Sequence, residues 1–153
     1  MATYNIVGYN TVANPPTFGS FWIYIRMDIS DMMDRGMVRR PGLLTGDYVY
    51  LAKLRDKWVI RDSYIRIPEA ADTGTQYNIG YSAAGTQIAA IVDGTDTATY
   101  ADWVQGTIDP NDSIASLTAD AYLQVHMNAG GPTDNGVLEL LLEIVAGPDD
   151  NGI

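Results

Sequence analysis

The chain has one histidine, His126, and no cysteine, so little of its chemistry can come from imidazole or thiol groups. A zinc site needs several histidine or cysteine ligands, and His126 has no second member of that kind. A serine nucleophile with His126 and an aspartate is formally possible, but no serine lies in a Gly-x-Ser-x-Gly turn. We therefore expect His126 to be a surface or interface residue. The serines considered are Ser63, Ser82, Ser113 and Ser116.

Carboxylates are plentiful, and two short segments, 93–96 and 109–112, each carry two aspartates. Glycoside hydrolysis needs two carboxyl groups at a defined separation around a sugar cleft. Aspartate and asparagine also bond to their own backbone in turns, and this is our prediction for both segments. Binding of a calcium ion by these carboxylates is the alternative to a turn, although neither segment has the full spacing of a calcium loop. We predict no catalytic residue, no metal and no cofactor.

Charge is divided unevenly along the chain. All nine Lys and Arg residues and six acids lie in residues 1–66, which gives +3, whereas residues 67–153 hold thirteen acids and no base. The net charge of −10 argues against a nucleic-acid partner, because phosphate binding needs a dense basic surface. The division predicts either a molecule with two different faces or a fold that pairs the charges in space. The stretch from Arg35 to Arg40 is the one basic cluster, and we expect it to contact an acidic protein surface or to be a solvated loop.

The chain start has neither the basic nor the apolar region of a secretory signal, and no apolar run is long enough to span a membrane. The absence of cysteine fits assembly in a reducing cytoplasm. We therefore expect a protein with no membrane association that is made in the cytoplasm.

Strict alternation of apolar residues predicts a chain made mostly of strands. In the last of them Leu138, Leu140, Leu142 and Ile144 share one face, and Glu139 and Glu143 are expected to point outward. Two short helical turns are predicted at 30–35 and 99–105. The predicted strands span 22–29, 47–54, 58–60 with 64–67, 76–81, 87–92, 122–127 and 137–145. Strands separated by turns in this way predict an all-β, jelly-roll-like sandwich of about 7–8 strands.

The first 20 residues are expected to form an extended N-terminal arm. Pro15 and Pro16 exclude a central strand there. The apolar side chains Tyr4, Ile6, Tyr9 and Phe18 favour an arm laid over this subunit or a neighbour rather than a free tail. We predict an arm at 1–20, a sandwich domain at 21–147 and a tail at 148–153.

Tyrosine and tryptophan far outnumber phenylalanine, with ten Tyr and three Trp against two Phe. Such side chains suit interfaces because they join an apolar body to a polar tip. Some must lie in the core, and a platform for sugar is a competing use. Those in the basic part of the chain are Trp22, Tyr24, Tyr48, Tyr50, Trp58 and Tyr64.

Two segments resemble the capsid decoration, or cement, proteins of tailed bacteriophages. They are GDYVYLAKLRDKWVIRDSYIRIPEAADTGTQYNIGYSAAGTQIAAIVDG and TADAYLQVHMNAGGPTDNGVLELLLEIV, and the resemblance covers residues 46–145. It consists of strands and turns, and the 45 residues before it lie outside. The resemblance implies a jelly roll without an active site that binds the outside of an assembled capsid, often as trimers.

The leading hypothesis is a virion structural protein that binds the outer capsid surface and stabilises contacts between major capsid subunits, with no enzymatic activity. A glycan-binding or fibre-type module would instead expose Trp22 or Trp58 in a groove. A carboxylate-based hydrolase would need a pocket with two convergent acids. The expected partners are the major capsid protein and other copies of the chain, in a trimer. The expected contact residues are Tyr4, Ile6, Tyr9, Phe18, Trp22, Arg35, Arg39 and Arg40.

Overall fold

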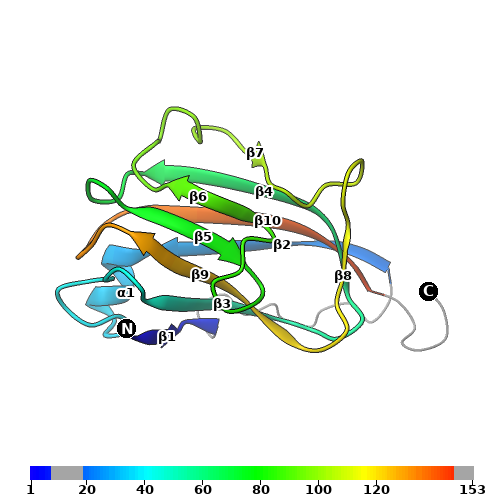
Figure 1. Cartoon of the computed structure of the whole chain (residues 1–153), viewed down its shortest axis with the longest axis horizontal. Helices are drawn as coiled ribbons and strands as arrows, with labels where there is room; N and C mark the ends of the chain where they lie inside the picture. Colours follow the sequence, from blue (N-terminus) through cyan, green and yellow to red (C-terminus); the bar gives the residue numbers. More distant parts are fainter. Residues whose placement is uncertain (8–18, 147–153) are drawn as a thin grey trace.

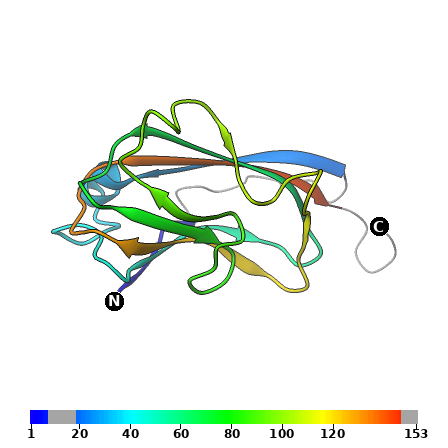
Figure 2. The same cartoon turned by 45° about the horizontal axis from the view of Figure 1, so that its top comes forward.

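The computed structural model describes residues 1–7 and 19–146, which form ten strands and one short helix in two facing sheets. Figure 1 shows the first sheet in front of the second, and Figure 2 shows the two as separate layers. The first sheet has the order β1-β3-β9-β5-β6, with strands Thr3–Asn5, Tyr48–Leu54, Ala121–Ala129, Gln76–Gly80 and Ala89–Asp93. The second sheet has the order β2-β10-β4-β7, with strands Gly19–Asp28, Val137–Ala146, Val59–Glu69 and Val104–Gln105, and β8 (Ala115–Ser116) also pairs with β4.

The connections confirm the predicted fold class. From β2 to β5 the chain passes from one sheet to the other at each step, and β9 and β10 then enter the middle of the two sheets. This alternation between two antiparallel sheets is the jelly-roll arrangement. Apolar side chains from both sheets fill the space between them, as the alternation in the sequence predicts.

The central strand of the second sheet is β10. It pairs with β2 from Val137↔Asp28 to Ala146↔Gly19 and with β4 on its other side. Leu138, Leu140, Leu142 and Ile144 are buried against the first sheet, as predicted. The strand begins after Gly136, whose φ of +110° favours glycine and whose added Cβ would lie 2.8 Å from Cα of Ala71.

Strand β4 runs from Val59 to Glu69 without a break, so the predicted interruption between residues 60 and 64 is wrong; its register with β10 does shift between Ile60 and Asp62. Two polar residues cause the difference, because both are satisfied inside the strand. Oδ1 of Asp62 accepts from Nε2 of Gln105 at 3.0 Å, and the hydroxyl of Ser63 donates to the carbonyl of Ile108 at 2.8 Å. Buried polar groups with such partners do not end a strand.

The predicted helical turn at 99–105 is also wrong. Oδ1 of Asp96 accepts from the backbone N of Thr99 at 2.8 Å, which stabilises a turn, and Val104–Gln105 then pairs with β4 as β7. The predicted turn at 30–35 is confirmed as α1, Ile29–Asp34, with Asp28 accepting from the backbone N of Asp31 at its start. Within the described ranges, no helix has the length and apolar character needed to cross a bilayer.

The first seven residues lie along their own subunit. Strand β1 pairs in parallel with β3, the backbone N of Ala2 donates to Asp47 at 2.7 Å, and Ile6 is completely buried in the core. Most of the predicted arm lies outside the described residues, including Tyr9 and Phe18. The whole of the predicted tail, 148–153, also lies outside them. The division into arm, domain and tail therefore stays a prediction.

We predict that Ile6→Ala lowers the free energy of unfolding by about 2–4 kcal/mol, because it removes a fully buried side chain and leaves a cavity. Thr3→Ala in the same strand is the control, with a change below about 0.5 kcal/mol because Thr3 is exposed. Urea unfolding measures both. Equal, small changes would mean that β1 does not pack on this core in solution.

Candidate protein-binding surfaces

The residues that could do nucleophilic chemistry are kept apart by the fold. His126 lies on β9 with its ring stacked on Tyr48 at a centroid distance of 4.6 Å. The hydroxyl of Ser63 donates to the carbonyl of Ile108, and that of Ser113 donates to the carbonyl of Thr107. No hydrogen bond between His126 and a serine occurs in residues 1–7 and 19–146.

The two aspartate-rich segments are turns, as predicted. Asp93 accepts from the backbone N and the hydroxyl of Thr95, and Asp109 accepts from the backbone N of Asn111 and of Asp112. These acids bond to their own turns, which is the role that aspartate commonly has there. The part of the chain that the structure describes contains no group of three or more His, Cys, Asp or Glu residues placed to hold a metal ion.

Two of the hollows on the described part of the surface bear on these alternatives. The first, of about 290 Å³, lies between β6 and β7 and is lined by no carboxylate. The second, of about 210 Å³, lies beside α1 and contains Asp34 and Asp134 together with Arg40. Trp22 lines neither hollow, and Trp58 is buried against Phe21 at a centroid distance of 5.3 Å. The groove with an exposed tryptophan that a glycan-binding module would require is therefore not found at these two places.

Folding pairs four of the nine basic residues with acids from residues 67–153. The pairs join Arg26 and Arg66 to Glu139, Arg61 to Glu143, and Lys53 to Asp120. For these four basic and three acidic residues, pairing of the charges in space therefore describes the structure better than two oppositely charged faces.

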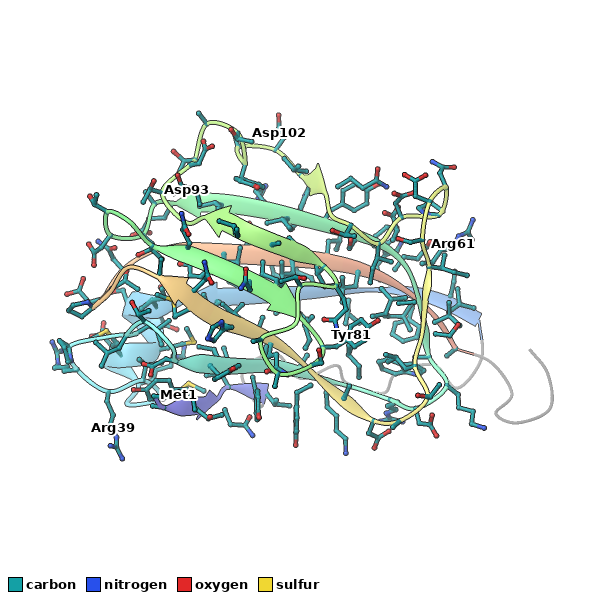
Figure 3. The ribbon with its side chains drawn as sticks, in the orientation of Figure 1. Met1, Arg39, Arg61, Tyr81, Asp93 and Asp102 are labelled. Carbon is teal, nitrogen blue, oxygen red and sulfur yellow. The ribbon has the colours of Figure 1, made fainter. Side chains whose placement is uncertain are left out.

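Arg39 and Arg40 form what we call the basic corner. Both are exposed, and neither makes an ion pair with another residue in the described ranges. The loop that carries them is held by Val38, which is buried, whereas Arg35 pairs with Asp31 at 3.0 Å. Figure 3 shows Arg39 at the same end of the molecule as Met1, with Arg61 at the opposite end.

A second surface is the outer face of the sheet β2-β10-β4-β7, which we call the outer aromatic face. Trp22 and Tyr24 on β2 are 47% and 49% exposed. The Trp22 ring lies 6.1 Å from that of Tyr64 on β4, and the Tyr24 ring lies 6.4 Å from that of Trp103. Leu141 of β10 stands in register between Tyr24 and Tyr64. The face therefore has an apolar, aromatic centre built from three adjacent strands and the segment before β7.

Glu139 lies within this face, so it points away from the core as predicted, but neighbouring side chains cover it. It is 1% exposed. Its Oε1 accepts from Nε of Arg66 at 2.7 Å, its Oε2 accepts from Nη1 of Arg26 at 3.3 Å, and the Tyr24 hydroxyl donates to Oε2. Burial raises the pKa of Glu139, whereas the two guanidinium groups favour its charged form.

The expected contact residues do not form one patch. Tyr4 is half-buried on β1 and Ile6 is buried, while Arg35, Arg39 and Arg40 follow α1. Trp22 lies six residues before the end of β2, so about 20 Å of strand separates it from α1.

Sequence reasoning did not assign Trp103 or Leu141 to the site. Leu141 could have been assigned from the sequence, because side chains alternate along a strand and Leu141 lies on the side of β10 opposite the core residues. No comparable signal marked Trp103, whose approach to Arg66, 5.0 Å from the ring centroid, depends on the pairing of β7 with β4.

No family model and no curated protein matches this chain in sequence. Two solved structures share its fold. A chain of the capsid of Ralstonia phage GP4 is 14% identical, with a TM-score of 0.58 and 97% of this chain and 99% of that chain covered. A chain of the cyanophage Pam1 capsid asymmetric unit is 12% identical, with a TM-score of 0.58 and 89% and 92% covered. At these identities the likeness is one of fold.

We predict that Glu139→Gln lowers the free energy of unfolding by about 1–3 kcal/mol, because two guanidinium groups lose their charged acceptor. Glu143→Gln on the same strand is the matched control. Its pair with Arg61 spans 3.6 Å and Arg61 is mostly exposed, so the change is expected to stay below about 1 kcal/mol. Urea unfolding of both variants measures the difference. Similar values would contradict a structural role for the buried carboxylate.

Proposed function

We propose that this chain is a structural protein of a tailed-phage virion, and specifically a decoration or cement protein bound to the outer surface of the capsid. The observation that carries the proposal is the fold likeness to chains of two phage capsids over nearly the whole length of both partners. Because 97% of this chain aligns with 99% of the Ralstonia phage GP4 chain, that chain is of similar size. The likeness therefore extends over nearly the whole of that chain.

The arrangement of side chains supports a role in binding rather than catalysis. The acid whose pKa burial raises, Glu139, is held by two arginines on a sheet face, not presented in a cleft. His126 stacks on a tyrosine, and the serines bond elsewhere. Aromatic and arginine side chains on the surface are the residue types that anchor protein contacts.

In the proposed mechanism the protein joins neighbouring major capsid subunits from the outside of the head, after synthesis in the host cytoplasm. Each copy buries a modest area, and the repeated sites of the shell make the binding multivalent when copies are joined as trimers. The basic corner would contact an acidic patch of the shell, because Arg39 and Arg40 have charges that no described residue neutralises. The acidic remainder of the molecule would face the solvent.

We predict that Arg39→Glu combined with Arg40→Glu weakens binding to mature heads that lack the protein by about tenfold or more. The reason is that two attractive contacts become repulsive. Binding of the unchanged protein should also weaken as salt is raised. Co-sedimentation of the purified protein with heads measures the occupancy.

The matched control is Arg55→Glu combined with Lys57→Glu. It makes the same change in net charge at two exposed residues of the β3–β4 turn. This variant should bind within about twofold of the unchanged protein. If both double variants bind like the unchanged protein, the basic corner is not a docking site. If the unchanged protein does not bind heads at all, the proposed function is wrong.

A further inference from the structure

We infer that the outer aromatic face is the surface pressed against the shell, and that its partner is a flat, nearly uncharged area of another protein. The inference rests on the proposed function and adds to it the surface used and the chemistry of the partner. Two sets of residues support it: the exposed or half-exposed Trp22, Tyr24 and Leu141, and the ion pairs of the buried Glu139 with Arg26 and Arg66 on the same face.

The face has the composition of an interface centre. Protein interfaces are enriched in tryptophan, tyrosine and arginine, and their strongest anchors are side chains that become fully desolvated. Trp22 and Tyr24 leave about half of their surface in water on the isolated chain. They stand next to each other along one side of the same strand, and each is already braced by a neighbouring ring, Tyr64 or Trp103. Little side-chain freedom remains to be lost when a partner covers them.

Most charges of the face are paired within the chain itself, and the carboxylate of Asp62 accepts a hydrogen bond from Gln105. Glu139 binds Arg26 and Arg66, and Glu143 binds Arg61. A charge buried at an interface without a partner is strongly unfavourable, so a partner docking here would otherwise have to supply matching charges. With the pairs already formed, the partner need supply only apolar surface and hydrogen-bonding groups.

The backbone under the face is rigid enough to present it as one unit. Every position of β10 from Val137 to Ala146 is paired with β2, and most are paired with β4. The face is therefore a continuous sheet surface, and Trp22, Tyr24 and Leu141 line neither of the two hollows described above. Flat sheet surfaces fit another flat protein surface better than they fit an oligosaccharide, which is usually bound in a concave site.

The size of the face favours a shell over a second free copy. The face is four strands wide and about seven residues long. With the usual strand spacing and rise per residue, its dimensions are roughly 19 Å by 24 Å and its area is on the order of 450 Å². A stable two-protein complex buries about 800 Å² on each partner. A shell can complete the area by contacting other parts of the same subunit, and it repeats the contact many times.

The test compares Trp22→Ala, Trp22→Tyr and Tyr122→Ala in co-sedimentation titrations with heads that lack the protein. Tyr122 is the matched control, because it is 38% exposed and stacked on Tyr50, but lies on the opposite sheet. We expect Trp22→Ala to weaken binding about tenfold or more, Trp22→Tyr to retain most of it, and Tyr122→Ala to stay within about twofold. Urea unfolding of each variant checks that the fold is kept.

Equal binding by Trp22→Ala and the unchanged protein would overturn the inference and leave the proposed function standing. No binding by the unchanged protein would instead contradict the proposed function. Sedimentation velocity of the isolated proteins provides a separate readout. If the unchanged protein self-associates and Trp22→Ala does not, a second copy occupies the face and the inference is wrong. Loss of binding to an oligosaccharide array in Trp22→Ala would overturn it in the same way.

Discussion

The double pairing of β10 is the constraint on which the rest of this molecule depends. Val137–Ala146 lies between β2 and β4, so its register fixes both neighbours at once. Because side chains alternate along a strand, a slip of one residue would turn four core positions, Leu138 to Ile144, toward solvent and send Glu139 into the core. The buried carboxylate adds to this specificity, since it meets both Arg26 and Arg66 in the observed register alone.

The surface chemistry follows from the same register. The side of β10 that carries Leu141 faces away from the core, and the pairing places an aromatic residue next to it on each side. The same register places Glu139 next to Arg26 and Arg66, and Glu143 next to Arg61, on the neighbouring strands. A chain whose acids and bases are separated in sequence thereby acquires a nearly neutral sheet face, with strong acidity left in the loops after Arg66. Such a face can be covered by a partner without leaving charges unpaired, which is the property that a cement subunit needs.

Much of the fold could be predicted from the sequence, because strict alternation identifies strands whose two sides differ. The strand around Ile23 and the one that contains Leu140 are examples. The errors have a common cause. The interruption predicted near Asp62, the helical turn predicted near Tyr100 and the unpredicted burial of Glu139 on the outer face all depend on partners distant in sequence, such as Gln105, Ile67 and Arg66. Local pattern does not contain those partners. The candidate site was predictable where it rests on residue type, as for Trp22 and Arg39. It was not predictable where pairing creates it, as for Trp103.

The docking of the outer aromatic face on the shell can be seen by electron cryomicroscopy of phage heads incubated with the purified chain. We expect density for this fold on the outside of the shell, with the side of the sheet β2-β10-β4-β7 that bears Trp22 turned toward the capsid surface. Density in which that side faces the solvent, or heads that carry no such density at saturating protein, would contradict it.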